Sequence, residues 1–453
     1  MPDTSTAEAQ SVGNPLAKRF TPLSLFRFAF PTIFMMVFMG LYTTVDTIFV
    51  SRFVNTNALS SINIVTPVIN LIVGLGAMLA TGGSAIIARK LGDAREADAR
   101  NDLTQITLLG LGIGVLIAII GLANIRPIVI ALGASEALLP YTLDYLSVLL
   151  FFAPANIVQV LFSVFFIAAG RPGLGMAASI AGGLANVALD YVFIVVMHMG
   201  IAGAALATGI GYAIPALVGL AFFLRNRSGA LFFTKPHFTV RVLLESCYNG
   251  SSEMVSQLSA AITTFYFNRA MLALLGEDGV AAITIIIYSQ FLLVTLYIGY
   301  SMGVAPIISY NYGNGNQAQL RRIRRMCFTF ITALSLVTFG LALWKGSWLV
   351  QLFSPGGTAV YNITRGGFAI FQYSFLFCGF TIFASALFTA LSNGLLSAVI
   401  SFSRTFVFLI AGIHILPIFL GVNGIWLTIP LSELLAFGLS VVLISMSRKR
   451  YKY

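Results

Sequence analysis

Charged residues are scarce in this chain. Among its 453 residues, Lys and Arg number 26 and Asp and Glu number 15, so that 9% are charged, whereas a typical soluble domain has about a quarter. Hydrophobic residues make up 58% of the sequence. These proportions exclude an ordinary soluble domain and indicate an integral membrane protein.

Cysteine and histidine are also rare. The three cysteines lie in or beside apolar runs without C-x-x-C spacing, which favours neither a disulfide framework nor a zinc site. The three histidines are far apart and form no metal-binding motif, so metal-centred catalysis is not expected. These residues are Cys247, Cys327, Cys378, His198, His237 and His414. The first 22 residues are polar and the first apolar run is too long for a signal peptide, so no cleavable leader is expected.

Long apolar runs fill most of the chain. Runs of about 20 residues fit membrane-spanning helices, because barrel strands would be about 10 residues of alternating polarity. Twelve spans are predicted, at about 24–50, 58–88, 102–123, 140–168, 173–196, 202–224, 242–275, 280–309, 326–344, 360–389, 394–416 and 424–446.

The basic residues are distributed unevenly between the two sides of these spans. Most Lys and Arg residues fall in segments on the side of the N-terminus, which predicts that both termini are cytoplasmic. Basic inner loops facing anionic lipid also account for the net charge of +11 without nucleic acid.

The sequence repeats itself at a shift of 221 residues, as from Gly92 to Gly313. Each half then holds six spans, so the two copies enter the membrane in the same orientation. We therefore expect an all-α polytopic membrane protein with 12 transmembrane helices in two six-helix lobes, related by a pseudo-two-fold axis along the membrane normal, with a cavity between them. The predicted parts are an N-terminal tail (1–22), an N-lobe (23–224), a cytoplasmic linker (225–241), a C-lobe (242–446) and a basic tail (447–453).

Several polar residues lie inside the predicted spans of the first half. Asp46 and Asp190 fall in the outer halves of the first and fifth spans, Thr208 lies at a similar depth in the sixth, and Asn186 is one helical turn before Asp190. Ionisable groups in a bilayer are costly, so this cluster is a candidate site for a proton or a sodium ion. The alternative is that Asp190 with Asn186 simply takes part in a satisfied interhelical hydrogen bond. At the shift of 221, the counterparts are all apolar: Phe267, Val407, Ala411 and Ile429.

Other ionisable residues lie in the second half. Glu253, at the start of the seventh span, is a candidate for substrate contact or for closing an inner gate, although an ion pair with a nearby arginine is an equal alternative. Arg404 and Glu433 are expected at different depths in neighbouring spans, with structural roles.

Five motifs together resemble the multidrug and toxic compound extrusion (MATE) transporters. They are VDTIFVSRF, ARKLGDAREADAR, AAGRPGLG, NVALDYVFI and GIAGAALATGI, and the resemblance covers nearly the whole chain. It is strongest to the branch with its coupling site in the N-terminal half. A different branch relies on acids in spans seven and ten, but here span ten has only Arg365.

The resemblance implies roles for six residues of the first half. Asp46, Asn186, Asp190 and Thr208 would form the cation site. The backbone carbonyl of Ala204 would be a further ligand, and Tyr145 would belong to the same network.

The expected function is secondary-active antiport, in which amphipathic and often cationic compounds leave in exchange for H⁺ or Na⁺. A lipid-linked saccharide flippase of the same superfamily is the alternative, although it should show a more basic cavity. An enzyme is not expected, because the carboxylates have no Ser, Cys or His partner. We expect a monomer in the bacterial inner membrane, with small amphipathic molecules and lipids as partners, no nucleic acid and no cofactor beyond the coupling ion.

Overall fold

The computed structural model describes residues 14–351, 354 and 356–451. In this part of the chain the regular elements are all helical. The first half contains η1 (Pro15–Ala17), α2 (Pro22–Phe53), α3 (Thr56–Gly92), α4 (Glu96–Ala123), α5 (Ile125–Ala131), α6 (Leu139–Phe151), α7 (Ala153–Ala168), α8 (Pro172–Asp190), the π-helix η2 (Tyr191–Val196) and α9 (Gly200–Arg225).

The second half contains α10 (Val240–Asn249), α11 (Ser251–Gly313), α12 (Gln317–Gln351), α13 (Ala359–Phe371), η3 (Gln372–Leu376), α14 (Cys378–Ala390), α15 (Gly394–Phe402), the π-helix η4 (Ser403–Leu409), α16 (Ile410–Leu420) and α17 (Val422–Tyr451).

The helices account for twelve membrane spans. Ten helical segments are long and apolar enough to cross a bilayer, and the bent pair α6 and α7 forms another. One of the ten, α11, has 63 residues, which at 1.5 Å per residue is about three times the thickness of the hydrocarbon core. It must therefore contain two spans, and it breaks at Gly276, whose φ of 65° is not helical. The predicted fold class is confirmed.

The fourth span is bent because of a proline. Helices α6 and α7 meet at an angle of 53° across Phe152. Pro154 has no N–H and disfavours helical geometry at the residue before it, so the chain turns there. A Cβ atom at Gly114 would lie 2.5 Å from the Cα of Pro154, so α4 packs closely against this bend.

The seventh span begins later than predicted. Residues 242–249 belong to the separate helix α10, and the membrane-spanning helix α11 starts at Ser251, after a break at Gly250. A Cβ at Gly250 would lie 1.8 Å from the carbonyl oxygen of Met78, and one at Gly82 would lie 2.0 Å from that of Ser246. Glycine at these positions lets the backbone of α10 lie directly against α3.

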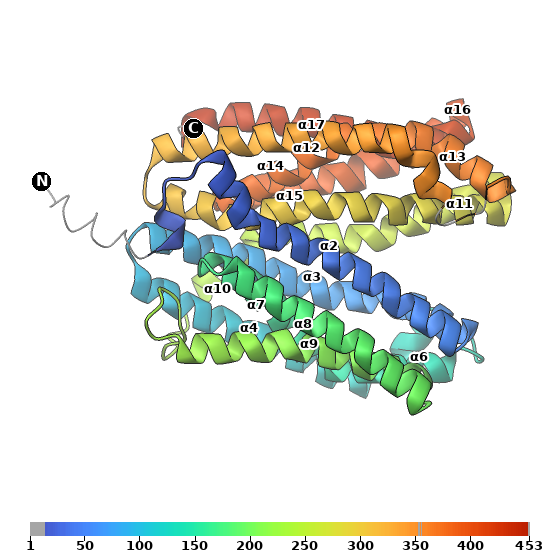
Figure 1. Cartoon of the computed structure of the whole chain (residues 1–453), viewed down its shortest axis with the longest axis horizontal. Coiled ribbons are helices and arrows are strands. Elements are labelled where there is room, and N and C mark those ends of the chain that lie inside the picture. The colour runs from blue at the N-terminus through green and yellow to red at the C-terminus, as the bar shows by residue number, and fades with distance from the viewer. Residues whose placement is uncertain (1–13, 352–353, 355, 452–453) are drawn as a thin grey trace, which may run out of the picture.

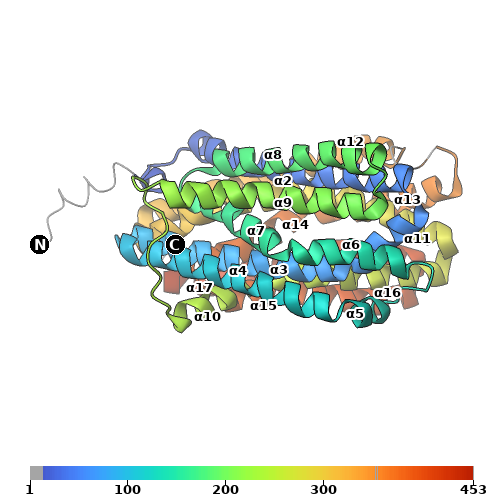
Figure 2. The same cartoon turned by 90° about the horizontal axis from the view of Figure 1, so that it is seen from below.

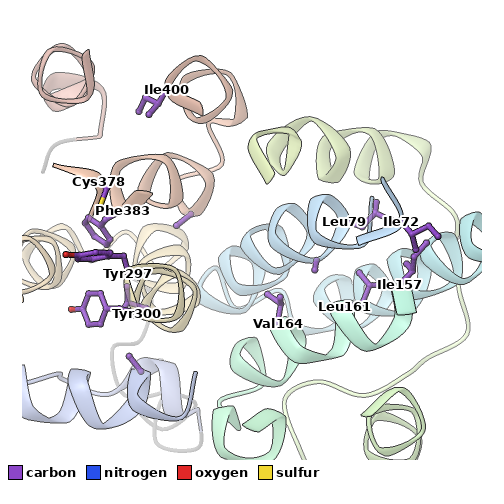
Figure 3. Close-up of a cluster of buried hydrophobic side chains, with 14 of the residues drawn as sticks. Ile72, Leu79, Ile157, Leu161, Val164, Tyr297, Tyr300, Cys378, Phe383 and Ile400 are labelled. Carbon is purple, nitrogen blue, oxygen red and sulfur yellow. The ribbon is translucent and has the colours of Figure 1, made fainter. Parts of the chain in front are cut away.

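The helices form two bundles, and α11 joins them by packing against α2 and α3 of the first half (Figures 1 and 2). Helix η1 and the end of α17 lie at the same end of the molecule, called the terminus end below (Figure 1). Each bundle has its own buried apolar side chains (Figure 3). Those labelled in the first are Ile72, Leu79, Ile157, Leu161 and Val164, and those in the second are Tyr297, Tyr300, Cys378, Phe383 and Ile400.

Backbone landmarks show how the two halves correspond. Positive φ angles occur at Ala94 and Gly315 and again at Gly200 and Gly421, and both pairs keep the shift of 221. The turn between α7 and α8 has its positive φ at Gly170, whereas the matching turn between α14 and α15 has it at Ser392, a shift of 222. Around this turn, equivalent residues of the two halves are thus 222 residues apart instead of 221, a slip of one residue in the repeat.

Candidate functional site

Three helices of the first half each carry two polar residues one turn apart. Helix α8 packs between α2 and α9. It carries Asn186 and Asp190, whereas α2 carries Tyr42 and Asp46, and α9 carries Thr208 and Tyr212. The i, i+4 spacing puts both members of each pair on one face, so side chains from all three helices can meet.

Two carboxyl groups face each other at this meeting point. Asp190 is fully buried, with 0% of its surface exposed, and its carboxyl group lies within hydrogen-bonding reach of that of Asp46. No donor among the described residues reaches either oxygen of Asp190 or Oδ1 of Asp46. Adjacent buried carboxylates repel each other when both are ionised. The pair therefore suits a shared proton or a bound cation.

Asn186 adds a further acceptor. Its Nδ2 donates to Oγ1 of Thr208 at 3.5 Å, which connects α8 to α9. Its Oδ1 is buried and receives no hydrogen bond from the described residues. The interhelical hydrogen bond to Thr208 therefore leaves this oxygen, and both oxygens of Asp190, without a donor in the described part of the chain. Carboxylate and amide oxygens are ligands of hard cations, so the arrangement is a chemically reasonable sodium site as well.

Three tyrosines, Tyr42, Tyr145 and Tyr212, lie near the carboxyl pair. Tyr145, on α6, is buried and lies within electrostatic range of Asp46 and Asp190, and also of Tyr42 and Tyr212. The structure thus brings Tyr145 to the predicted cluster. Ala204 is buried on α9, one turn before Thr208, and its role as a ligand stays a prediction.

A small cavity lies beside the cluster, between α2, α7, α8 and α9. The volume of this cavity is about 10 Å³, which is close to the smallest volume that can hold one water molecule. The polar side chains that line it are Tyr42, Gln159, Ser179, Asn186, Thr208 and Tyr212. The cavity gives the site a polar interior with room for one water molecule or a small ion.

Sequence reasoning missed four of these six residues, namely Tyr42, Gln159, Ser179 and Tyr212. Tyr42 and Tyr212 stand one turn from Asp46 and Thr208, so extending the i, i+4 argument from Asn186 and Asp190 to the neighbouring helices would have found them. Gln159 carried no such signal, because its place depends on how α7 packs against α8 and α9.

The ionisable residues of the second half lie apart from this cluster. Glu253 is in the first turn of α11, and it is partly buried without an ion pair to any described residue. Arg404 and Glu433 were expected at different depths with structural roles. Their side chains form an ion pair, with Arg404 Nη2 at 2.5 Å from Glu433 Oε1, and a long arginine side chain can span a difference in depth.

The chain matches one protein family twice. The MatE family model matches residues 31–192 and again residues 254–413, so each match covers most of one half. The chain belongs to the MatE family. The double match confirms that the two halves are copies of one MatE unit.

Curated relatives of this MatE chain include multidrug export proteins MepA. That of Staphylococcus haemolyticus is 25% identical over 368 residues, which are 79% of this chain and 80% of the relative. That of Staphylococcus saprophyticus is 23% identical over 410 residues, 89% of this chain and 87% of the relative.

Solved structures establish the same fold. The crystal structure of a MATE protein in complex with MaL6 gives a TM-score of 0.90 at 23% identity, over 98% of both chains. An outward-facing multidrug resistance MATE transporter of the MOP superfamily gives a TM-score of 0.89 at 23% identity, also over 98% of both chains.

Proposed function

We propose that this protein is a multidrug antiporter, which exports amphipathic and often cationic compounds in exchange for H⁺ or Na⁺. The observation that carries the proposal is the pair of facing carboxyl groups, Asp46 and Asp190, with no donor from the described residues to three of their four oxygens. The names of the MepA relatives support export of several drugs.

The coupling step follows from the charge of this pair. An incoming proton or sodium ion is shared by Asp46 and Asp190, lowers the charge of the pair from −2 to −1 and draws α2 towards α8. This movement narrows the cavity between the lobes, and the substrate leaves. Release of the cation on the opposite side restores the repulsion between the carboxylates and readmits substrate. The two lobes thereby alternate in access, with no cofactor other than the coupling ion.

The protein acts, in this proposal, as a monomer in the bacterial inner membrane with both termini in the cytoplasm. The shared end of η1 and α17 supports the placement of both termini on one side (Figure 1). Its partners are small amphipathic substrates and membrane lipids.

The alternative function, flipping of a lipid-linked saccharide, requires free positive charge for a pyrophosphate group. Arg404 does not supply it, because Glu433 neutralises its guanidinium. Of the two intramembrane arginines, only the exposed Arg365 then remains as support for the flippase, and we therefore favour antiport.

Substitution of the two carboxylates tests the proposal. Asp46→Asn and Asp190→Asn keep the shape of the side chains but remove the charge that the cation neutralises. We expect drug export from proteoliposomes under an imposed H⁺ or Na⁺ gradient to fall at least about tenfold, the effect of about 1.4 kcal/mol. Comparing the two gradients in the unmodified protein identifies the coupling ion.

Asp144→Asn is the matched control. Asp144 is an exposed carboxylate on α6, directly before Tyr145, and we expect its substitution to leave export unchanged. Normal gradient-driven export by both Asp46→Asn and Asp190→Asn would show that the assigned coupling site is wrong.

A further inference from the structure

A buried carboxylate of the C-lobe, that of Glu433, has a partner on each of its two oxygens. Arg404 on η4 donates from Nε to Oε1 of Glu433 at 2.8 Å, and its Nη2 lies 2.5 Å from the same oxygen. Thr381 on α14 donates from its hydroxyl to Oε2 of Glu433 at 2.9 Å. Glu433, on α17, is only 3% exposed. Both oxygens of this carboxylate therefore have partners, unlike those of Asp190.

Backbone landmarks place this cluster at the counterpart of the N-lobe cavity. Counted from the last residues of α14 and α7, Ala390 and Ala168, Thr381 stands where Gln159 stands. Counted from the positive-φ residues Gly421 and Gly200, the position of Glu433 corresponds to that of Tyr212. Counted from the N-cap residues Asn393 and Arg171, the position of Arg404 corresponds to that of Gly182.

All three N-lobe counterparts, Gln159, Gly182 and Tyr212, line the N-lobe cavity. The two lobes thus differ at one shared place. In the N-lobe, Gly182 packs tightly against α9, where a Cβ would lie 2.5 Å from the carbonyl oxygen of Gly211, and the adjacent cavity is lined by Asn186, whose Oδ1 lacks a donor among the described residues. In the C-lobe, an arginine stands at the position of that glycine and its guanidinium neutralises the carboxylate.

We propose that Glu433 and Thr381 form a latent site for a small monovalent cation in the C-lobe, and that Arg404 occupies it permanently as a tethered cation. An arginine side chain stays protonated in proteins, so its charge cannot leave the site. The charge of Arg404 then permanently takes the place of a bound cation in the C-lobe, so only the N-lobe binds and releases a cation. This last point rests on the proposed antiport function, whereas the site itself does not.

The test removes the tethered cation and measures whether a free one replaces it. The background is Asp190→Asn, which eliminates the exchangeable carboxylate of the N-lobe. Purified protein in detergent is heated in sodium chloride or in guanidinium chloride at low millimolar concentration, with choline chloride as the ionic-strength control. With Arg404→Ala added, we expect sodium or guanidinium to raise the unfolding temperature by about 3 °C over choline, because the ion binds only the folded state.

Two further variants separate a cation site from a structural ion pair. Arg404→Lys keeps a tethered charge and should show no dependence on the added cation. Arg404→Ala combined with Glu433→Gln removes the carboxylate and should lose the cation effect. The proposal is overturned if folded Arg404→Ala gains no more from sodium or guanidinium than the protein that retains Arg404.

Misfolding of Arg404→Ala would also be informative. Recovery of a monodisperse chromatographic peak in guanidinium, but not in choline, supports the latent site, and failure in every salt counts against it. The outcome is independent of the antiport proposal. The Asp190→Asn parent, which retains Arg404, could be stabilised by cations as strongly as the unmodified protein. In that case the coupling site assigned to Asp190 in the N-lobe is wrong, but the comparison of C-lobe variants with and without Arg404 still tests the latent site.

Discussion

At the scale of single residues, Asp190 differs from the other buried acids of the described chain. Asp102 pairs with Lys90 at 2.5 Å, and Glu433 pairs with Arg404 at the same distance. Asp190 has another carboxyl group as its neighbour instead. A buried charge without a partner is strongly unfavourable, so a site of this kind persists where an exchangeable cation supplies the missing charge.

Tyr145→Phe tests whether the tyrosine hydroxyl belongs to this site. The ring stays buried on α6 and only the hydroxyl is lost, so the fold should be unaffected. Because the hydroxyl lies within electrostatic range of both carboxyl groups, its loss should weaken cation binding, and we expect the apparent affinity for the coupling cation in vesicle export to fall about tenfold, the effect of about 1.4 kcal/mol.

Tyr191→Phe is the control for this substitution. Tyr191 follows Asp190 directly in the chain, but it is 53% exposed, whereas Tyr145 is buried. Equal effects of the two substitutions on cation affinity would refute a role for the Tyr145 hydroxyl.

The sequence could predict which residues share a face when both lie on the same helix. Asn186 and Asp190 share a face because of helical periodicity alone. The ion pair between Glu433 and Arg404, which lies in the π-helix η4, was not predicted. Side-chain reach across two helices is a tertiary property that the apolar runs do not encode.

At the scale of elements, two glycines control how α3 and α11 cross at the terminus end. A Cβ at Gly92 would lie 2.0 Å from the carbonyl oxygen of Tyr310, and one at Gly313 would lie 2.0 Å from that of Arg89. Neither position tolerates a side chain without separating the helices. This backbone contact holds the two lobes together at that end.

Gly92→Ala should therefore destabilise the protein. The added methyl group meets backbone rather than a flexible side chain, so we expect a loss of about 1–3 kcal/mol, the range found for overpacked cores. Thermal unfolding in detergent measures it.

Gly438→Ala on α17 is the matched control, because no atom lies within 4 Å of a Cβ added there. Alanine is the better helix former, so this substitution should be neutral or slightly stabilising. If both variants unfold at the same temperature, the backbones of α3 and α11 are not packed so closely at Gly92 that a methyl group is excluded.

The sequence predicted most elements but not how the linker is held. Residues 225–241 were expected only as a polar connection. In the structure, Asn101 of α4 donates to the carbonyl oxygen of His237 at 2.9 Å and accepts from its N–H at 2.7 Å, and Gln105 accepts from the N–H of Thr239 at 2.9 Å. These bonds position the start of α10, which explains why a separate helix replaces the first turns of the predicted seventh span.

At the scale of the whole molecule, the topology can be tested directly. We expect alkaline phosphatase fused to the C-terminus to be inactive, because this enzyme matures only outside the cytoplasm, and a fusion directly after Gly276 to be active. Activity assays on whole cells measure both, and green fluorescent protein at the same points should give the opposite pattern. An active phosphatase at the C-terminus would reverse the proposed orientation.

The whole-molecule architecture was the most predictable level, because twelve apolar runs and one internal shift define it. The one-residue slip near Gly170 and Ser392 was not predictable. An apolar run with one residue more has almost the same composition as before, so the slip can be recognised only from the backbone angles of the structure.

The crossing of α3 and α11 has a further consequence. Gly92 faces the carbonyl of Tyr310, and Gly313 faces that of Arg89. Gly313 is the repeat counterpart of Gly92, and Tyr310 is that of Arg89, so the two contacts are equivalent under the internal repeat. A reciprocal contact of this kind is the signature of an isologous interface in a two-fold symmetric dimer. A single six-span subunit, dimerising about this axis in parallel orientation, would form both contacts with one glycine, and gene fusion would then have left the two glycines free to diverge.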